Sequence, residues 1–339
     1  MSVVSNNILA GSSGQGGGGY EIERSLRFNS GDSAYLSRAQ SSGNTKTFTY
    51  SFWIKKVGAQ GSWPHIIGAD QNSDNRAHIR WNSDKLQCYF VTGNSTKLNL
   101  QPSRVFRDYG AWFHVVLAVD STQATSSNRA KLYINGELQD AFDYSTYPSQ
   151  NDVFSVNNSS ATATIGRRNY DTSNYINGYL ADVHFIDGQA LAETDFGALD
   201  DNGVWQPKEF AGTYGTNGFH LDFADNSSNA ALGTDTSSNG NTWTVNNLSV
   251  AAGTGNDSLV DSPTNGTQTD TGAGGEITGC YATLNPIDRK STVSLSNGNL
   301  DATTSSTGWA GVKGTMGVSS GKYYFEATAN GSAANKVFF

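Results

Sequence analysis

The chain has 339 residues, which is enough for two domains with sizeable cores, and its formal net charge is −8. Charged residues make up 15% and aromatic residues 11% of a sequence rich in Gly, Ser, Thr and Asn, which excludes a mainly helical protein and a disordered chain. The negative charge argues against a nucleic-acid partner, and no apolar run approaches the ~20 residues of a membrane span.

The first 19 residues differ from the rest of the chain. They contain no Lys or Arg and no long apolar core, so they do not form a recognisable secretory signal. The stretch GSSGQGGGG cannot contribute to a core and loses much entropy if it becomes ordered. Residues 1–19 are therefore either a flexible linker or an anchoring arm that orders on a partner protein, with SVVSNNILA supplying apolar residues to bury.

From Tyr20 onward, apolar and polar residues alternate in short runs, which is the period of β-strands. Asn135-Gly136 separates two such runs and predicts a two-residue hairpin turn, because both positions favour positive φ. The predicted strands lie within residues 25–37, 46–56, 65–91, 111–120, 128–142, 162–169 and 179–187. The alternation places these residues in or near the core: Phe52, Trp112, Val116, Leu132, Ile134, Val183 and Phe185.

Beyond Trp205 the sequence becomes more polar. Residues 206–275 contain two strand-like pieces, FHLDF and TWTV, and predict a connector with little core of its own, packed across the first domain. Residues 276–339 begin another all-β pattern. The two cysteines, Cys88 and Cys280, are far apart in sequence, which indicates a reducing compartment rather than a disulfide framework.

Two motifs resemble a known family. GAWFHVVLAVDSTQATSSNRAKLYINGELQD resembles the laminin-G-like, concanavalin A-like pattern of Trp, one residue, His, a strand ending in Asp, a loop and Leu-Tyr-x-Asn-Gly. IGRRNYDTSNYINGYLADVHFIDGQALAETDF resembles the closing motif of that family, and SSGKYYFEATA resembles the early strands of a SPRY domain. The expected fold is all-β: an antiparallel jelly-roll sandwich over residues 20–205 with a Gly-rich N-terminal arm, and a second, incomplete SPRY-like β part over residues 276–339.

The order of these parts resembles structural proteins of marine tailed bacteriophages. The resemblance implies a virion protein (a tail fibre, appendage or capsid decoration) assembled in the host cytoplasm. Its expected partners are other virion proteins through residues 1–19, further copies of itself, and a glycan or protein of the host surface, without membrane insertion. The alternatives are a bacterial lectin-like carbohydrate-binding module or degraded glycosidase, and a purely structural spacer.

The sequence predicts no enzymatic site. Glycosidases of this fold use paired carboxylates, and only Glu21 and Glu23 have the i, i+2 spacing that puts two carboxyl groups about 5 Å apart. They border the Gly-rich arm, so a solvated first strand is the expected role. The five histidines form no zinc motif, and a packed or hydrogen-bonded histidine is expected at His114 and His184.

Two candidate sites remain. Asp70, Asn72 and Asp74 have the i, i+2, i+4 spacing of oxygen ligands around Ca²⁺, the only cofactor that the sequence suggests, although a polar turn capped by Asx side chains gives the same pattern. Aromatic residues in loops rich in Asn and Asp could stack on sugar rings, although aromatic residues of a sandwich also fill its core. The candidate glycan-binding residues are Trp63, Trp81, Tyr144, Tyr147, Tyr170 and Tyr175.

Overall fold

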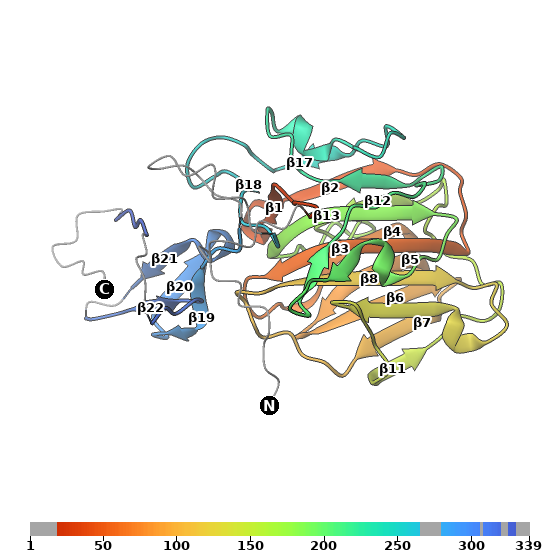
Figure 1. Ribbon diagram of the computed structural model, residues 1–339, viewed down its shortest axis with the longest axis horizontal. Helices are drawn as coiled ribbons and strands as arrows, with labels where there is room; N and C mark the ends of the chain where they lie inside the picture. The colour runs from red at the N-terminus through yellow and green to blue at the C-terminus, as the bar shows by residue number, and fades with distance from the viewer. Residues whose placement is uncertain (1–18, 265–278, 306–307, 320–324, 330–339) are drawn as a thin grey trace.

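The computed structural model describes residues 19–264, 279–305, 308–319 and 325–329. Two eight-stranded antiparallel sheets face each other and form a jelly-roll-like sandwich, which confirms the predicted all-β fold (Figure 1). Helical structure among the described residues is limited to short 3₁₀ helices: η1 (Ser30–Asp32), η2 (Ser126–Asn128), η3 (Glu193–Asp195), η4 (Ala230–Gly233) and η6 (Asn297–Asn299).

The first sheet has the strand order β10-β9-β8-β3-β13-β1-β18, with β16 also paired to β13. The hairpin between β9 and β10 turns at Asn135 (φ 49°) and Gly136 (φ 77°), as the Asn-Gly pair predicts. The bounds of its strands are β1 (Ser25–Phe28), β3 (Thr47–Lys56), β8 (Trp112–Asp120), β9 (Ala130–Ile134), β10 (Glu137–Leu138), β13 (Gly178–Asp187), β16 (Phe219–Leu221) and β18 (Ser258–Leu259).

The second sheet has the order β11-β7-β6-β5-β4-β12-β2-β17, and β4 to β7 are consecutive hairpins in it. The bounds of its strands are β2 (Tyr35–Ala39), β4 (Ser62–Asn72), β5 (Asn75–Asn82), β6 (Lys85–Thr92), β7 (Ser95–Pro102), β11 (Phe142–Thr146), β12 (Thr162–Ile165) and β17 (Thr244–Asn246).

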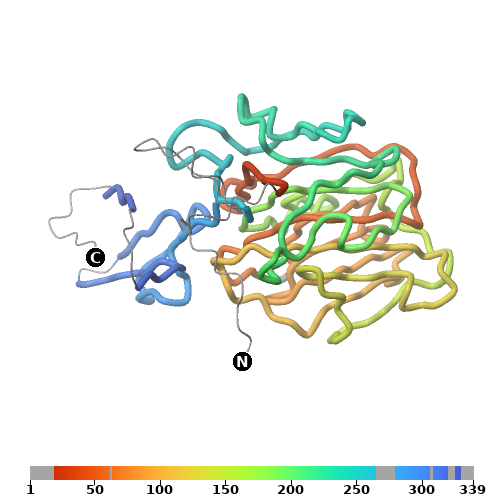
Figure 2. The backbone as a smooth tube through the Cα atoms, in the orientation of Figure 1, coloured from red at the N-terminus to blue at the C-terminus, as the bar shows by residue number. Residues whose placement is uncertain are grey.

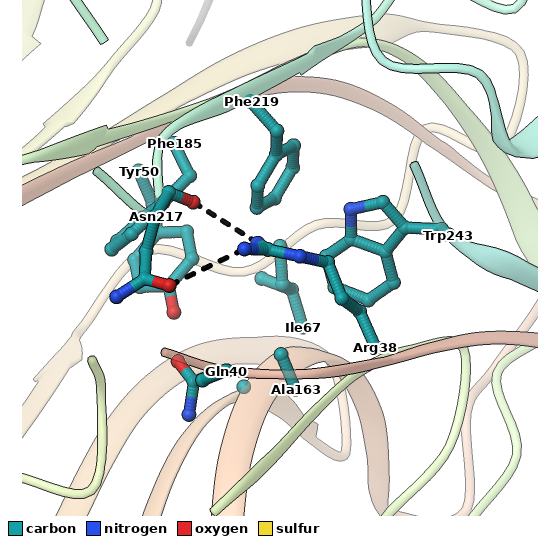
Figure 3. Close-up of a pocket in the computed structure, with 10 residues that line it drawn as sticks. Arg38, Gln40, Tyr50, Ile67, Ala163, Phe185, Asn217, Phe219 and Trp243 are labelled. Atoms are coloured by element: carbon teal, nitrogen blue, oxygen red, sulfur yellow. Dashed lines mark hydrogen bonds between the residues drawn. The ribbon is translucent and has the colours of Figure 1, made fainter. Parts of the chain in front are cut away.

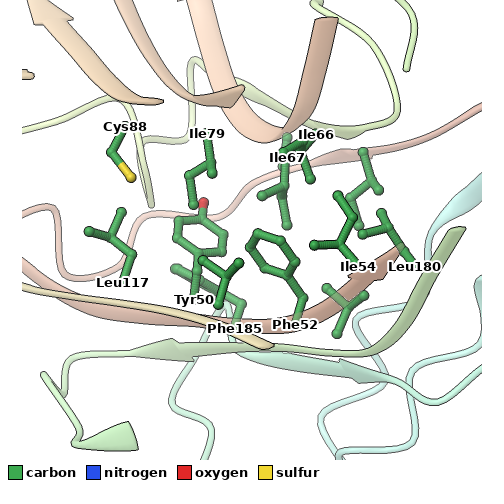
Figure 4. Packing of buried hydrophobic residues seen from close by; sticks show 14 of the residues in the cluster. Tyr50, Phe52, Ile54, Ile66, Ile67, Ile79, Cys88, Leu117, Leu180 and Phe185 are labelled. Atoms are coloured by element: carbon green, nitrogen blue, oxygen red, sulfur yellow. The ribbon is translucent and has the colours of Figure 1, made fainter. Parts of the chain in front are cut away.

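The main core lies between the two sheets (Figure 4). Tyr50, Phe52 and Ile54 of β3 extend from the first sheet toward Ile67 and Ile79 of the second. All seven residues that alternation placed in the core are at most 5% exposed, which confirms that prediction. Five belong to the main core, whereas Trp112 and Val116 lie in smaller apolar clusters on the other face of the first sheet.

The first sheet is buried on both faces because later parts of the chain cover its outer side. Trp112 packs there with Trp205 and Cys280, while Val116 packs with Phe196. The buried ammonium group of Lys55 is 2.7 Å from the Asp261 carboxylate. The short strands β14 (Gly197–Leu199) and β15 (Trp205–Pro207) form a separate pair in this region.

Residues 206–264 belong to the sandwich itself. They supply β16, β17 and β18 to the two sheets, and Phe219, Leu232 and Trp243 to the main core. The packing across the first domain therefore includes strand pairing, and the sandwich extends beyond the predicted boundary at residue 205. Residues 206–264 therefore differ from the predicted connector, because they contribute side chains to the main core of the sandwich.

The C-terminal strands are β19 (Leu284–Arg289), β20 (Val293–Ser296), β21 (Asp301–Thr304) and β22 (Val312–Gly314), which form two two-stranded sheets. They lie at one end of the sandwich, as the tube drawing shows (Figure 2). The hydroxyl of Tyr179 in the sandwich donates to the carbonyl oxygen of Gly298 at 2.7 Å. The SPRY-like identity of this part stays a prediction, and the predicted arm lies outside the described residues except for Gly19.

Candidate functional site

The outer face of the second sheet carries a dense set of polar and aromatic side chains. Along β5, Ala77, Ile79 and Trp81 point into the core, so Arg76, His78, Arg80 and Asn82 lie on the opposite face. The neighbouring strands β6 and β7 add to this face, because residues paired across a sheet share a side. Their contributions to the outer face are Gln87, Tyr89, Asn99 and Gln101.

Aromatic rings and guanidinium groups alternate across this face. The Arg80 guanidinium lies 4.4 Å from the Tyr89 ring and 5.3 Å from the Trp63 ring. Arg76 lies 5.7 Å from Tyr89 and 5.8 Å from Tyr170. Such contacts hold the cations in place without neutralising them. We call this set the arginine–aromatic row, and its members are Trp63, Arg80, Tyr89, Arg76, Tyr170 and Arg168.

Hydrogen bonds between side chains fix the polar groups beside the row. Arg80 Nε donates to Gln87 Oε1 at 3.0 Å, and Gln87 Nε2 donates to Asn99 Oδ1 at 2.8 Å. In a parallel chain of bonds, Asn82 Nδ2 donates to Gln101 Oε1 at 2.7 Å. These amides are therefore held in defined orientations, which lowers the entropy lost when they bind a polar ligand.

A buried carboxylate positions the loop that ends the row. Asp70 Oδ2 accepts from the backbone N–H groups of Asn169 at 3.0 Å and Tyr170 at 3.4 Å. In the same loop the Arg168 guanidinium stacks 4.7 Å from the Tyr170 ring and pairs with Asp171. Asp70 thus anchors the loop so that Tyr170 lies at the edge of the face.

Two buried histidines lie beside this carboxylate. His78 Nε2 is 2.7 Å from Asp70 Oδ1, and the rings of His65 and His78 are 4.3 Å apart. Gly68 lies beside the pair, and a Cβ there would lie 2.0 Å from the Ala77 carbonyl oxygen and 2.6 Å from His65 Nε2. Burial lowers the pKa of both histidines, and Arg80 and Arg76 lower the pKa of His78 further. Burial raises the pKa of Asp70.

Arg80 is the most constrained cation of the row. It is only 9% exposed, and burial lowers the pKa of its guanidinium to about 10. Among the described residues, no carboxylate forms an ion pair with Arg80 or Arg76, whereas Arg168 pairs with Asp171. A buried cation without an anionic partner is unfavourable, so this face carries positive charge that a ligand can neutralise.

Four of the six predicted glycan-binding residues border this face. Trp63 and Tyr144 are 46% and 52% exposed, and Tyr144 pairs with Gln101 across the β11–β7 ladder. Tyr170 belongs to the row, and Tyr175 packs edge-on against Tyr35 of β2, 6.3 Å between ring centroids.

The other two predicted residues do not reach the face. Trp81 is fully buried in the main core, because it neighbours Arg80 in the strand and points to the opposite side. Tyr147 is partly buried and packs against the same core. Trp81 is therefore corrected from a glycan-binding residue to a core residue.

The predicted calcium ligands do not act together. Asp70 is buried and bonds to His78 and to the 167–175 loop. Asn72 Oδ1 accepts from the backbone N–H groups of Asp74 and Asn75, which is the Asx-capped turn considered as the alternative. A register shift between Asp70 and Asn72 breaks the alternation on which the i, i+2 spacing depends.

Sequence reasoning missed most of the row because it sought binding residues in loops. The signal was present in NRAHIRWN, KLQCYFV and STKLNLQP, where polar or aromatic residues alternate with apolar ones in three successive strands. Three hairpin-linked strands with this alternation place all their polar positions on one face. The missed members of the row are Arg76, Arg80, Tyr89 and Arg168, and the amides of Gln87 and Asn99 beside it were missed as well.

A small cavity inside the sandwich is a separate feature (Figure 3). It is lined by Arg38, Tyr50, Phe219 and Trp243 among others. Arg38 donates to both the backbone and side-chain oxygens of Asn217, as the dashed lines show. Burial lowers the pKa of Arg38. The cavity lies among core side chains, and its arginine is already hydrogen-bonded, so it is not the candidate binding site.

No helix among the described residues is long and apolar enough to span a membrane.

The two glutamates with the i, i+2 spacing, Glu21 and Glu23, are exposed, and the residue between them, Ile22, is buried.

Comparison with known proteins shows what the chain is similar to. The sequence matches no curated protein. A pentraxin of Limulus polyphemus aligns with 16% identity over 51% of this chain and 80% of its own, with a TM-score of 0.36. A candidate carbohydrate-binding protein of Bacteroides ovatus aligns with 18% identity over 67% of this chain and 59% of its own, with a TM-score of 0.43. Domains LG4-5 of mouse laminin alpha1 align with 13% identity over 60% of this chain and 48% of their own, with a TM-score of 0.34.

The chain thus spans less than two thirds of the length of the latter two proteins. The family model for the concanavalin A-like lectin/glucanases superfamily, Laminin_G_3, matches residues 28–195. The matched segment contains both motifs that suggested the resemblance and most strands of both sheets. Residues 28–195 thus resemble the concanavalin A-like lectin/glucanases superfamily, and the jelly-roll-like sandwich that they help to form agrees with that resemblance.

Proposed function

We propose that the outer face of the second sheet binds an acidic polysaccharide. The observation that carries the proposal is Arg80: a guanidinium only 9% exposed, placed between Trp63 and Tyr89, with no carboxylate partner among the described residues. A uronate or sulfate group would supply that partner through charge-assisted hydrogen bonds, which are stronger than neutral ones.

The other groups on the face suit the neutral parts of a sugar chain. Trp63 and Tyr144 offer exposed rings for stacking, and Gln87 and Asn99 offer oriented amides for hydroxyl groups. From β11 to β2 the face crosses six strand spacings, which is about 29 Å at ~4.8 Å each. That width suits an extended chain rather than a single sugar.

We also propose that binding occurs without catalysis. Glu21 and Glu23 flank the buried Ile22 in the segment before β1, whereas the row lies on the second sheet. Two carboxylates adjoin the row, and both are already engaged: Asp70 is buried and anchors the Tyr170 loop, and Asp171 pairs with Arg168. Incubation with the polysaccharides that bind should therefore release no reducing ends. Turnover that disappears in Glu21→Gln or Glu23→Gln would overturn this part of the proposal.

A panel of polysaccharides tests the binding site. Affinity electrophoresis of the full chain through gels containing a polyuronate, a sulfated polysaccharide or a neutral glucan should show retardation by an acidic polymer only. Trp63→Ala should weaken retardation at least about 5-fold, since truncation of an aromatic residue at the centre of a binding site costs more than ~1 kcal/mol. The matched control is Trp309→Ala, because Trp309 is 77% exposed and lies in the C-terminal part. Equal loss in both variants would contradict the site.

The wider setting is the proposed virion role. The Gly-rich segment that precedes the sandwich in the sequence supports attachment of the chain to a particle. Many weak sites on one particle would raise the apparent affinity for a glycan about 10²- to 10⁴-fold through avidity. Deletion of residues 1–19 should leave the sandwich folded and abolish incorporation into particles. Normal incorporation of the deleted chain would exclude the anchoring role, while glycan binding by the isolated chain would remain a separate result.

A further inference from the structure

A second cluster of titratable side chains lies on the outer side of the first sheet, away from the arginine–aromatic row. It consists of Asp182 and His184 of β13 and His220 of β16. Asp182 Oδ1 is 2.8 Å from His220 Nε2 and 3.1 Å from His184 Nε2. Each residue thus offers one potential ligand atom, and the three atoms lie within 4.8 Å of one another.

The backbone is shaped to bring these groups together. His184 and His220 are paired across the β13–β16 ladder, and their rings stack at 4.1 Å. Asp182 has φ 50°, in the left-handed region that non-glycine residues rarely adopt, at a register shift of β13. Residues kept in such conformations within regular structure often serve a function.

The other ring nitrogens of both histidines are already engaged. His184 Nδ1 is 3.0 Å from the Tyr214 hydroxyl, and His220 Nδ1 is 3.0 Å from the Thr236 hydroxyl. Hydrogen bonds of this kind orient imidazole ligands and fix which nitrogen faces a metal. His184 Nε2 is buried and makes no hydrogen bond within the described part of the chain, although it faces the carboxylate.

The surroundings of the cluster are acidic, which favours a cation. The Asp235 carboxylate accepts from the backbone N–H of His220 at 2.9 Å, and Asp222 lies two residues after His220 in the chain. Among the described residues, no Lys or Arg forms an ion pair with Asp182.

The cluster of His65, Asp70 and His78 provides the contrast. It has the same residue types and is also buried. Arg80, Arg76 and Arg168 lie close enough to lower the pKa of His78, so the field there opposes a cation. Residue type alone does not separate the two clusters, whereas the surrounding charge does.

We propose that Asp182, His184 and His220 bind a divalent first-row transition metal ion, foremost Zn²⁺, through one carboxylate oxygen and the two Nε2 atoms. Two imidazoles and one carboxylate are a donor set that suits Zn²⁺. The Tyr20 hydroxyl donates to Asp182 Oδ1 at 2.9 Å and so holds the carboxylate in place, which leaves the fourth position for a water. The ion would link β13 and β16, so its role would be structural.

Calorimetric titration of the full chain, freed of metal with a chelator, tests the proposal. We expect one Zn²⁺ per chain and a higher melting temperature, since an ion that binds only the folded state stabilises it. His220→Gln and Asp182→Asn should each weaken binding by about 100-fold or more, because loss of a direct ligand exceeds the 10- to 100-fold cost of a lost supporting bond. His78→Gln, in the contrasting cluster, should leave binding unchanged.

A second measurement needs no variant that could fail to fold. In ¹⁵N-histidine NMR spectra of the unaltered chain, Zn²⁺ should shift the Nε2 resonances of two histidines while their Nδ1 atoms stay protonated. Absence of stoichiometric binding by the folded chain, or binding that only His78→Gln abolishes, would overturn the proposal. The polysaccharide-binding tests do not depend on this site, so the metal proposal and the polysaccharide proposal can be refuted independently.

Discussion

Replacing Arg80 with Met separates a binding role from a structural one. The substitution removes the guanidinium from the centre of the row and keeps an unbranched side chain of similar reach. If Arg80 is held as an unpaired cation for a ligand, its removal should abolish most binding and leave the fold intact. If Arg80 mainly holds the sheet together, the fold should suffer first.

The expected change in stability follows from opposing contributions. Burial lowers the pKa of Arg80 from 12.5 to about 10, which corresponds to about 3 kcal/mol of unfavourable charge burial at ~1.36 kcal/mol per pKa unit. Met relieves that cost. It also loses the hydrogen bond to Gln87, about 1.5–3 kcal/mol because the donor is charged, and two ring contacts of roughly 0.5–1 kcal/mol each. The free energy of unfolding should therefore fall by no more than about 2 kcal/mol.

The effect on binding should be much larger. A hydrogen bond between charged groups contributes about 1.5–3 kcal/mol, so loss of the Arg80 partner should weaken binding of an acidic oligosaccharide about 10- to 100-fold. Urea denaturation measures the first quantity and isothermal titration calorimetry the second. The control is Arg104→Met, because Arg104 lies outside the row and pairs with Glu137 at 3.7 Å.

Two results would refute this reasoning. Binding by Arg80→Met within twofold of the parent chain would show that Arg80 does not contact the ligand. A fall of more than about 3 kcal/mol in the free energy of unfolding would show that its contacts to Gln87 and Tyr89 matter more than its unpaired charge.

Three further results are expected. Asp70→Asn should misplace the loop that Asp70 anchors and lower the free energy of unfolding by about 1–3 kcal/mol, as measured by denaturation. It should also weaken glycan binding, as measured by calorimetry, although Asp70 itself does not contact the ligand. Ile134→Ala should cost about 2–5 kcal/mol by denaturation, and a change within ±0.5 kcal/mol would contradict its core position. Burial lowers the pKa values of His65, His78 and His114 in the folded chain. Below pH ~6.5 the unfolded chain therefore binds more protons than the folded chain does. The free energy of unfolding should fall there as the pH is lowered, by up to about 4 kcal/mol per pH unit for the three histidines together. Equal urea midpoints at pH 7 and pH 5.5 would contradict the neutral, buried state of these histidines.

The strands and core were predictable because their signal is local. Alternation in β3 and β9 identified Phe52 and Ile134 as core residues from neighbouring residues alone. The same rule, applied to β5, would have assigned Trp81 to the core and Arg80 to the outer face. That error came from treating aromatic residues as loop residues rather than from any absence of signal.

Other features depend on contacts that no local pattern contains. Strands β16, β17 and β18 have two or three residues each and pair with strands far away in the sequence, so residues 206–264 read as a polar connector. The pairing of His184 with His220 follows from the same distant ladder. The spacing of Asp70 and Asn72 was misleading because an irregular register separates them.

The measurement that tests the account most directly is a structure of the chain soaked with an acidic oligosaccharide, such as a short oligouronate. The account predicts a sugar chain across β4 to β7, with one acidic group on the Arg80 guanidinium and a ring stacked on Trp63 or Tyr89. An oligosaccharide bound instead at the loops at either end of the sandwich, or none on this face at a saturating concentration, would contradict the central claim.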